Sequence, residues 1–220
     1  MSAPPSFAAQ LRAAADPIWT AQHAHPFVRG VADGTLPVSQ FERYVRQDYV
    51  FLIDYGRLLA LGAARAPDFP TMRRFAGLTQ AILGGEMELH RAFAREFGIT
   101  DEDLEGEEPA FVTRAYTDFL LRTAALGDFA ELAAALLPCM WGYAEIGERL
   151  AAGPRPPDPR YARWIDTYAD PEFAELATWC RGLVDRLAAE TGEAGRERMR
   201  RAFLVCSEHE LAFWNVGLEA

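Results

Sequence analysis

The chain has 220 residues, half of them hydrophobic, which is enough for one compact domain with a substantial buried core. Its formal net charge of -10 argues against binding to nucleic acid or to an anionic membrane surface, because both need clustered Lys and Arg. The three cysteines include no close CxxC pair, which argues against a disulfide framework and a thiolate zinc site and favours reduced thiols.

Targeting and membrane signals are not visible in the sequence. Residues 1–7 have neither a basic start nor an apolar run before a small-residue cleavage site. The longest apolar stretch, residues 132–143, is shorter than the roughly 20 residues that a membrane-spanning helix needs, and Pro138 interrupts it. We therefore expect a soluble protein of the cytoplasm.

Helical spacing of apolar residues runs through almost the whole chain, and no alternating segment is long enough for a sheet, which predicts an all-α fold. The predicted helices are, in chain order, one that follows Ser6, one that Ser39 caps and that reaches about Ala66, one from Asp68 and Pro70 to near Phe97, one with Pro109 in its first turn, one over 129–152, shorter ones around 161–168 and 171–189, and a last one over about 193–216.

Two connections between the predicted helices have an unusual composition. The acidic segment 101–108 is predicted to be a solvated linker between helices. The proline-rich segment 153–159 is predicted to be a stiff loop, since hydrophobic patterning continues after it. We therefore expect a single domain over residues 1–220.

Cys139 follows Pro138 inside the predicted fifth helix. A proline in a helix leaves the carbonyl four residues earlier, that of Ala134, without its usual donor and bends the axis, so Cys139 lies beside a local irregularity. Tyr143 shares its face one turn later. Spacing alone favours a structural role, because cysteine is often a small buried hydrophobe, whereas a reactive thiol needs a lowered pKa or a neighbouring base.

Asp48 lies in the middle of an aromatic stripe. Tyr44, Asp48, Phe51, Leu52 and Tyr55 follow at steps of three and four residues on one helix face. A carboxylate there needs a partner, and two interpretations stay open. It is either a core aspartate paired with an arginine or a tyrosine hydroxyl, or an acceptor for the amino group of a ligand.

Glu210 is the anomalous acid of the last helix. Its face otherwise carries Phe203, Cys206, Phe213 and Trp214. Burial against aromatic rings would raise its pKa above the roughly 4.3 of a free glutamate, which suits a general acid/base near neutral pH. The alternative is a glutamate that reaches a buried arginine or tyrosine.

Over essentially the whole chain, these segments resemble the thiaminase II (TenA) family. The matching stretches are, in order, 25–37 (HPFVRGVADGTLP), 41–52 (FERYVRQDYVFL), 86–90 (EMELH), 136–147 (LLPCMWGYAEIG), 164–168 (WIDTY) and Glu210 with Phe213 and Trp214. The resemblance implies an all-helical bundle similar to haem oxygenase, in agreement with the helical periodicity. It also implies a homotetramer and an enzyme without a metal or organic cofactor.

Position by position, the resemblance implies a role for each of the three unusual residues. Cys139 falls on the family's nucleophile, Asp48 on its pyrimidine-holding aspartate and Glu210 on its acid/base glutamate. The family's pocket aromatics correspond to Phe51, Tyr116, Tyr143 and Tyr168, which would stack on or hydrogen-bond to a flat heteroaromatic ring. Tyr143 would lie close enough to Cys139 to hydrogen-bond it.

The implied reaction is hydrolysis at the methylene carbon of a 4-amino-5-methylene-2-methylpyrimidine, which releases either an amine or the thiazole ring of thiamine. The family comes in cysteine-bearing and cysteine-lacking branches, and this sequence resembles the former. Two positions depart from its pattern, because His209 stands where many relatives carry tyrosine and Asn215 where aspartate is common. These departures leave the leaving group less defined than the pyrimidine.

Three other functions would each need particular residues or a particular pocket. A haem-binding oxygenase of similar fold would need an axial histidine, for which His25 is the candidate, although His25-Pro26 is better explained as turn chemistry. A di-iron site would need two Glu-x-x-His pairs, and the chain has only Glu86 and His90 at a spacing of four. A non-catalytic pyrimidine-binding or regulatory protein would keep the pocket without turnover.

Overall fold

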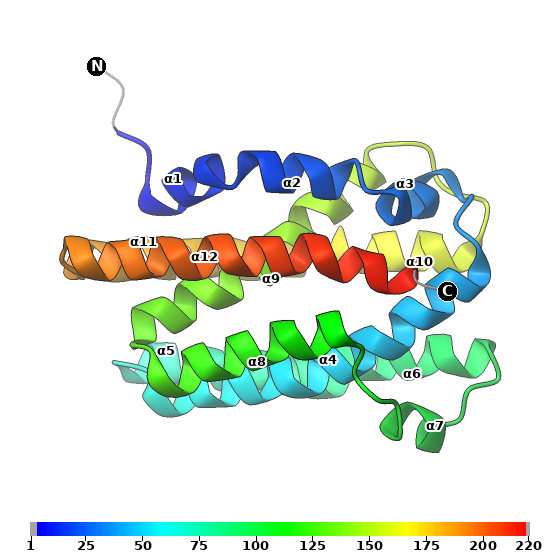
Figure 1. Cartoon of the computed structure of the whole chain (residues 1–220), viewed down its shortest axis with the longest axis horizontal. Coiled ribbons are helices and arrows are strands. Elements are labelled where there is room, and N and C mark those ends of the chain that lie inside the picture. Colours follow the sequence, from blue (N-terminus) through cyan, green and yellow to red (C-terminus); the bar gives the residue numbers. More distant parts are fainter. Residues whose placement is uncertain (1–3, 219–220) are drawn as a thin grey trace. The chain divides into compact units, whose positions relative to one another are not determined.

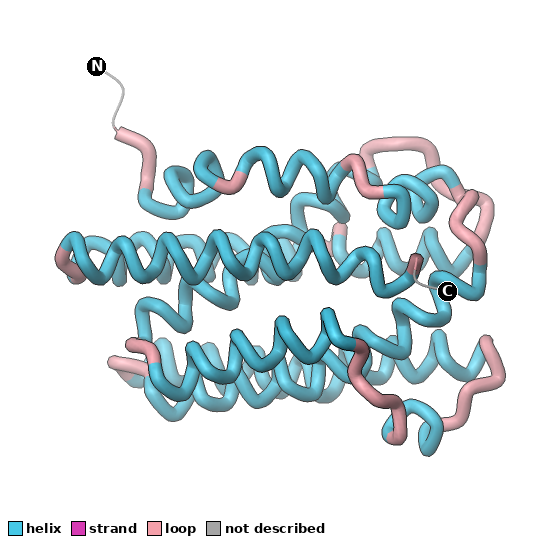
Figure 2. The backbone as a smooth tube through the Cα atoms, in the orientation of Figure 1, coloured by secondary structure: helices cyan, strands magenta, loops and turns pink. Residues whose placement is uncertain are grey.

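The computed structural model describes residues 4–218, and within this range every regular element is a helix. Figure 2 shows helices joined by short loops, with no strand drawn along the described chain. This confirms the all-α prediction. Among the described helices, none combines the length and the apolar composition needed to cross a bilayer.

The chain divides into two compact units, which we describe separately. The first unit comprises Met1–Leu36 and Ala130–Leu211, and the second comprises Pro37–Phe129 and Ala212–Ala220. The single domain over residues 1–220 stays a prediction.

The first unit is built from helices at both ends of the chain. They are α1 (Phe7–Ala14), α2 (Asp16–His23), α3 (Pro26–Asp33), α9 (Phe129–Ala151), α10 (Pro159–Tyr168), α11 (Pro171–Glu190) and α12 (Glu193–Phe213), with the unit boundaries falling inside α9 and α12. Trp19 anchors its core, where the indole Nε1 donates to Ser207 Oγ at 3.1 Å. The same ring stacks on Phe203 at 6.0 Å and meets Trp141 edge-on at 5.3 Å. A buried indole contributes a large apolar area, and the hydrogen bond of its N–H group fixes the orientation of the ring.

The N-terminal region differs from the single first helix that we expected after Ser6. Ser6 does cap α1, since its side chain accepts from the N–H of Ala9. The helix then breaks twice, with Pro17 and Pro26 in the first turns of α2 and α3. Proline fits the first turn because that N–H has no helical acceptor, but it removes a hydrogen bond in the middle of a helix.

The second unit is organised around a 28-residue helix, α4 (Val38–Arg65). The other elements are α5 (Phe69–Gln80), the π-helix η1 (Ala81–Glu86), α6 (Met87–Glu96), α7 (Asp101–Glu105), α8 (Phe111–Leu126) and the 3₁₀-helix η2 (Trp214–Gly217). α4 packs against α5, α6, α8 and η2, and Figure 1 shows α8 running beside it. Gly62 lets α5 approach closely, because a Cβ there would lie 2.4 Å from the ring of Phe75.

Several predicted boundaries of the second unit are correct. α4 ends at Arg65 with Ala66 as its C-cap, and the side chain of Asp68 accepts from Thr71 N–H to cap α5. α6 ends at Glu96, and Gly98 has a positive φ of 75° just beyond it. That left-handed conformation is one that glycine adopts without steric cost.

Other local predictions were wrong. Ser39 does not cap α4, which begins at Val38 after Pro37, and Pro109 precedes α8 rather than entering its first turn. The acidic segment 101–108 is not simply a solvated linker, because it contains α7. Thr100 and Asp103 form a reciprocal capping box that starts this short helix. Such a box satisfies two orphan N–H groups, which allows a helix in a strongly acidic stretch.

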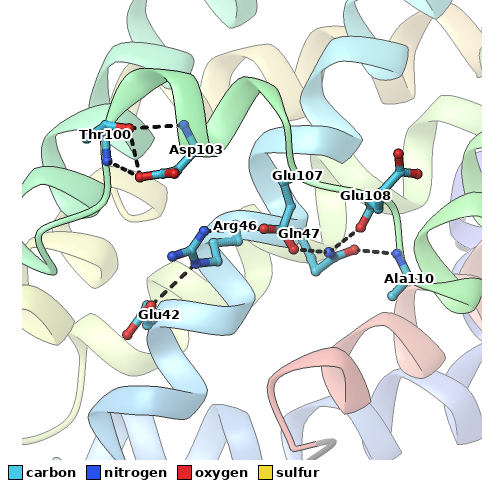
Figure 3. A network of polar contacts seen from close by, with 8 residues as sticks. All are labelled: Glu42, Arg46, Gln47, Thr100, Asp103, Glu107, Glu108 and Ala110. Carbon is cyan, nitrogen blue, oxygen red and sulfur yellow. Dashed lines mark hydrogen bonds and ion pairs between the residues drawn. The ribbon is translucent and has the colours of Figure 1, made fainter.

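Gln47 of α4 attaches the segment between α7 and α8. Its Nε2 donates to Glu107 Oε1 at 2.9 Å and to the carbonyl of Glu108 at 3.0 Å. Its Oε1 accepts from Ala110 N and from Thr113 Oγ1, both at 2.8 Å. Figure 3 shows the amide between Glu107, Glu108 and Ala110. All four hydrogen-bonding positions of this buried amide are therefore used.

Candidate functional site

The predicted site residues lie on five helices, with some in each unit. The second unit holds Asp48 and Phe51 on α4 and Tyr116 on α8. The first unit holds Cys139 and Tyr143 on α9, Tyr168 on α10 and Glu210 on α12. That the two groups line one cavity stays a prediction.

Asp48 is only 3% exposed and is held by two hydrogen bonds. The hydroxyl of Tyr44, one turn earlier on α4, donates to Oδ2 at 3.0 Å. The ring Nε2 of His90 on α6 lies 2.7 Å from the same oxygen. Within residues 4–218, Oδ1 has no hydrogen-bond partner. The partners of a core aspartate are therefore present, and one carboxylate oxygen is left over for a ligand.

His90 was missed as a site residue in the sequence. It is 1% exposed, and its Nδ1 lies 2.9 Å from the carbonyl oxygen of Glu86, four residues earlier. Burial by itself lowers the pKa of His90, but the charge and hydrogen bond of Asp48, together with Glu86, raise it overall. The available signal is the stretch 86–90, which is one of the segments that resemble the family, although the resemblance assigned no role to its histidine.

An aromatic cluster lies along the face of α4 that carries Asp48. The ring of Phe51 lies 5.0 Å from that of Tyr116, 5.4 Å from Tyr55 and 5.5 Å from Phe213. Tyr44 stacks on Trp214 at 5.9 Å. The stripe predicted from the spacing on α4 is thus extended by α8 and by the end of the chain. The structure brings Phe51 and Tyr116 together, and their place in a substrate pocket stays a prediction.

Cys139 differs from the other two thiols in its exposure. It is half-buried on α9, whereas Cys180 and Cys206 are buried. Burial and the charge of Glu210 raise the pKa of the Cys206 thiol well above its ordinary value. Reactive cysteines are accessible, whereas buried cysteines in apolar surroundings are inert. Of the three thiols, Cys139 has the exposure that chemistry requires.

A second aromatic cluster includes Tyr143, which lies one turn after Cys139 on α9. The ring of Tyr143 lies 4.8 Å from Tyr168 and 6.2 Å from Trp164, and Tyr168 lies 5.4 Å from Phe173. The structure thus brings Tyr143 and Tyr168 together, and their place in a substrate pocket stays a prediction. Trp164 belongs to the matched stretch 164–168, but we had assigned it no role.

Glu210 is 2% exposed, which confirms that it lies on the buried face of α12. It is close enough to Cys206, one turn earlier, for its charge to disfavour the thiolate there. Its neighbour His209 is half-buried, and burial lowers the pKa of that imidazole despite the opposing charge of Glu208. The proton-transfer role of Glu210 stays a prediction.

A hollow of about 250 Å³ lies on another part of the first unit. It is lined from α9 and α11 by Trp141, Ala144, Glu145, Glu148, Ala174, Ala177, Thr178 and Arg181. At 100° per residue, the α9 positions among these point away from Cys139 and Tyr143. The hollow is therefore separate from the predicted catalytic face of α9.

Glu145, at the edge of this hollow, has cationic partners. His23 Nε2 lies 2.9 Å and Arg12 Nη2 lies 2.8 Å from Oε1. Burial would raise the pKa of Glu145, but hydrogen bonds from His23 and Arg12 and their charges lower it to about 2. This carboxylate is committed to a structural ion pair.

The histidines considered for other cofactors have local partners. His25 is the N-cap of α3, where its Nδ1 accepts from the N–H of Phe27 at 3.3 Å, as turn chemistry predicts. His90 contacts Asp48 and Glu86 as described above. In the part of the chain that the structure describes, no group of three or more His, Cys, Asp and Glu side chains is arranged to hold a metal ion.

The TENA/THI-4/PQQC family matches residues 12–220. The chain is 45% identical over 213 residues to a protein of Halalkalibacterium halodurans named aminopyrimidine aminohydrolase, and the alignment covers 96% of this chain and 95% of that protein.

Solved structures agree in fold. A TenA homologue protein from P. horikoshii OT3 matches with a TM-score of 0.90 at 35% identity, over 97% of this chain and 98% of that one. A domain from Shewanella denitrificans OS217 described as having a heme oxygenase-like fold matches with a TM-score of 0.74 at 11% identity, over 95% and 90% of the two chains. The second likeness concerns the fold alone, and it confirms the predicted haem-oxygenase-like bundle.

Proposed function

The chain belongs to the TENA/THI-4/PQQC family, and from this premise we propose that it is a hydrolase of thiamine-pathway aminopyrimidines. The 45% identity to a protein named aminopyrimidine aminohydrolase, over 96% of this chain, supports this activity. The proposed product is 4-amino-5-hydroxymethyl-2-methylpyrimidine. The proposed substrates are 4-amino-5-aminomethyl-2-methylpyrimidine, thiamine, or both.

The nucleophile in this proposal is Cys139, and the observation that carries it is the contrast among the three thiols. Cys139 is half-buried at the position where the family resemblance predicts a nucleophile. Cys180 is buried, and Cys206 has a raised pKa beside Glu210. A thiolate must form and reach substrate to attack it, which disfavours both alternatives.

The proposed chemistry replaces one difficult displacement by two easier steps. The Cys139 thiolate forms a bond to a carbon of the electron-poor pyrimidine ring, and the added electron density expels the leaving group from the methylene carbon. The leaving group departs with the electron pair of its bond, and an amine also takes a proton. Water then adds its oxygen to the methylene carbon and gives up a proton, and the C–S bond breaks to restore the ring and the thiolate.

Asp48 and Glu210 supply orientation and proton transfer in this scheme. Oδ1 of Asp48, which has no hydrogen-bond partner among residues 4–218, would accept from the 4-amino group and so fix the ring. Glu210, buried on an apolar face, would carry protons between the ring nitrogen, the leaving group and water. The rings of Phe51, Tyr116, Tyr143 and Tyr168 would enclose the flat substrate.

Replacement of the thiol tests the mechanism. Cys139→Ser is expected to abolish turnover of both substrates and to leave the helical circular dichroism signal unchanged, because serine keeps the size of the side chain but is a far weaker nucleophile. Cys180→Ser is the matched control, since it makes the same change at a buried thiol outside the proposed machinery, and its activity should be retained. If Cys139→Ser retains the activity of the wild type, the thiolate mechanism is refuted.

A binding experiment tests the role of Asp48. Asp48→Ala is expected to weaken binding of the hydroxymethylpyrimidine product in calorimetry, because the ring loses its charged acceptor. Unchanged affinity would refute the orienting role. A protein that binds this product but turns over neither substrate would support the alternative of a non-catalytic pyrimidine-binding or regulatory protein.

Comparison of kcat/KM for thiamine and for the aminomethylpyrimidine identifies the preferred leaving group. The two substrates share the pyrimidine and differ only beyond the methylene carbon. A higher kcat/KM for the aminomethylpyrimidine would indicate salvage of degraded thiamine, and a higher value for thiamine would indicate thiaminase activity.

We further propose that the protein is cytoplasmic and assembles as a homotetramer. Large apolar side chains on the second unit support an assembly, since Phe111 is 85% exposed and Leu126 is 79% exposed. Burying such side chains between copies is favourable. Size-exclusion chromatography with light scattering is expected to give about four times the chain mass, and a monomer would refute the assembly.

A further inference from the structure

The buried pair of His90 and Asp48 has an unusual proton arrangement. Both ring nitrogens of His90 face oxygen atoms, with Nδ1 2.9 Å from the carbonyl oxygen of Glu86 and Nε2 2.7 Å from Oδ2 of Asp48. Both side chains are buried, with that of His90 1% exposed and that of Asp48 5% exposed. Their mutual contacts therefore determine where the protons lie.

The carbonyl oxygen of Glu86 can only accept, so Nδ1 of His90 must carry a proton. The short contact at Nε2 then needs a second proton between His90 and Asp48. The hydroxyl of Tyr44 already donates to the same Oδ2, so this oxygen acts as an acceptor and Nε2 is the donor in the short contact. With the second proton on Nε2, His90 is an imidazolium that donates to Oδ2, and the pair has no net charge.

The surroundings are consistent with this charge state. The titratable groups that contact the pair or act on its charge are Glu86 from η1 and Tyr44 from α4. Glu86 favours the charged imidazole, and burial alone opposes it. The neighbouring cation Arg91 is engaged with Glu88 and with the hydroxyl of Tyr49.

We propose that His90 is a positioning residue that keeps Asp48 an acceptor, so that the site selects pyrimidines with an amino group over those with an oxo group at the same ring position. The proposal rests on the proposed function, in which Asp48 meets the 4-amino group. His90 does not touch the substrate in this role. It acts by holding Oδ2 through a hydrogen bond, so that Oδ1 is presented to the ligand as an acceptor.

The selection follows from the hydrogen-bonding inventory of Asp48. Oδ1 has no partner within residues 4–218, and an ionised carboxylate oxygen can only accept. An amino group offers it an N–H. A 4-oxo ring would place a carbonyl oxygen against it, which leaves two buried acceptors without a donor. We expect the 4-amino compound to bind about 100-fold more tightly than its 4-oxo analogue.

Calorimetry on the full chain tests this selectivity. The ligands are 4-amino-5-hydroxymethyl-2-methylpyrimidine and its 4-oxo analogue, and the key variant is His90→Gln. Glutamine can still donate to Oδ2 but carries no charge, so the variant keeps a hydrogen bond and removes the imidazolium that holds Asp48 as an acceptor. The amino-to-oxo affinity ratio is expected to fall at least about tenfold.

The affinity ratio separates positioning from simple structural support. If His90 only supports the fold, His90→Gln weakens both ligands together, and an unchanged ratio overturns the proposal. Asp48→Asn is the companion variant, because its amide can donate to an oxo group and should shift the preference toward the oxo ligand. If Asp48→Asn and Asp48→Ala both leave both affinities unchanged, the proposed function itself fails.

Nuclear magnetic resonance of the wild-type protein provides a measurement that does not depend on a variant folding. The chain has four histidines, so ¹⁵N-labelled imidazole resonances can be resolved, and His90 is assigned by its absence from His90→Gln or by its contact with Asp48. Both ring nitrogens of His90 are expected at the shifts of protonated nitrogen at neutral pH. A resonance of unprotonated nitrogen would overturn the proposal.

Discussion

Gly147 on α9 allows the end of α10 to approach more closely than any side chain would permit. A Cβ built at Gly147 would lie 2.4 Å from the carbonyl carbon and 2.5 Å from the carbonyl oxygen of Tyr168, and 2.7 Å from the nitrogen of Ala169. Ordinary carbon–carbon contacts are about 3.5–4.0 Å, so the backbone would have to move by roughly 1 Å. Gly147→Ala should therefore destabilise the first unit and displace Tyr168.

Two opposing terms determine the size of this effect. Alanine in place of glycine inside a helix stabilises by about 0.5–1 kcal/mol, because the unfolded chain loses less entropy on folding. Overpacking against neighbouring groups costs about 1–3 kcal/mol, and here the neighbours are backbone atoms that cannot rotate away. The net destabilisation is about 1–2 kcal/mol, which for a chain of this size lowers Tm by about 2–8 °C.

Gly142 on the same helix is the matched control. A Cβ there would have Gln22 Oε1 at 4.0 Å as its nearest neighbour, which is ordinary contact. Gly142→Ala should keep the helix-propensity gain and raise Tm by up to about 4 °C. Thermal unfolding followed by circular dichroism measures both variants. If Gly147→Ala is as stable as the wild type, or shifts Tm like Gly142→Ala, the close approach to Tyr168 is refuted.

Two further predictions concern buried polar groups. Gln47→Leu should lower the free energy of unfolding by about 2–4 kcal/mol in urea titrations, because it removes the partners of Glu107, Ala110 and Thr113, and a loss below 0.5 kcal/mol would contradict this. The depressed pKa of Glu145 means that its contribution to stability is complete above about pH 4.5 and is lost as the pH falls toward about 2. Glu145→Gln should flatten that acid limb, and an unchanged pH dependence between 4.5 and 2 would contradict the assignment.

Helix boundaries could be predicted where local chemistry determines them. The end of α6 before Gly98 and the Asp68 cap of α5 depend on a glycine with positive φ and on a side-chain acceptor, and both are visible in a few residues. The π-helix at 81–86 could not be predicted in this way. A π-helix is stabilised by what the flanking helices pack against, since its own hydrogen bonds are no better than those of an α-helix. Leu83 within it packs over Gly56 of α4.

Helical periodicity correctly placed Asp48 and Glu210 on buried faces, because the 3.6-residue repeat is a property of one segment. The partners of these acids are only partly of that kind. Tyr44 is four residues from Asp48 and could be found from the spacing. His90 is 42 residues away on a different helix, and only the packing of α6 against α4 brings it to Oδ2.

The proton arrangement of the Asp48 site shows why partners matter more than faces for function. An aspartate with only Tyr44 as a partner would have one donor on Oδ2 and no second group that determines which hydrogen-bonding role it takes toward a ligand. The second partner, His90, brings its own proton and is itself fixed by a carbonyl that can never donate. In our proposal, selectivity for an amino group therefore depends on the carbonyl of Glu86, which is two hydrogen bonds away from the carboxylate that would meet the ligand. The sequence pattern of one helix cannot predict this arrangement. The contact between His90 and Asp48 joins two helices, and the contact between His90 and Glu86 depends on the turn of backbone that precedes His90.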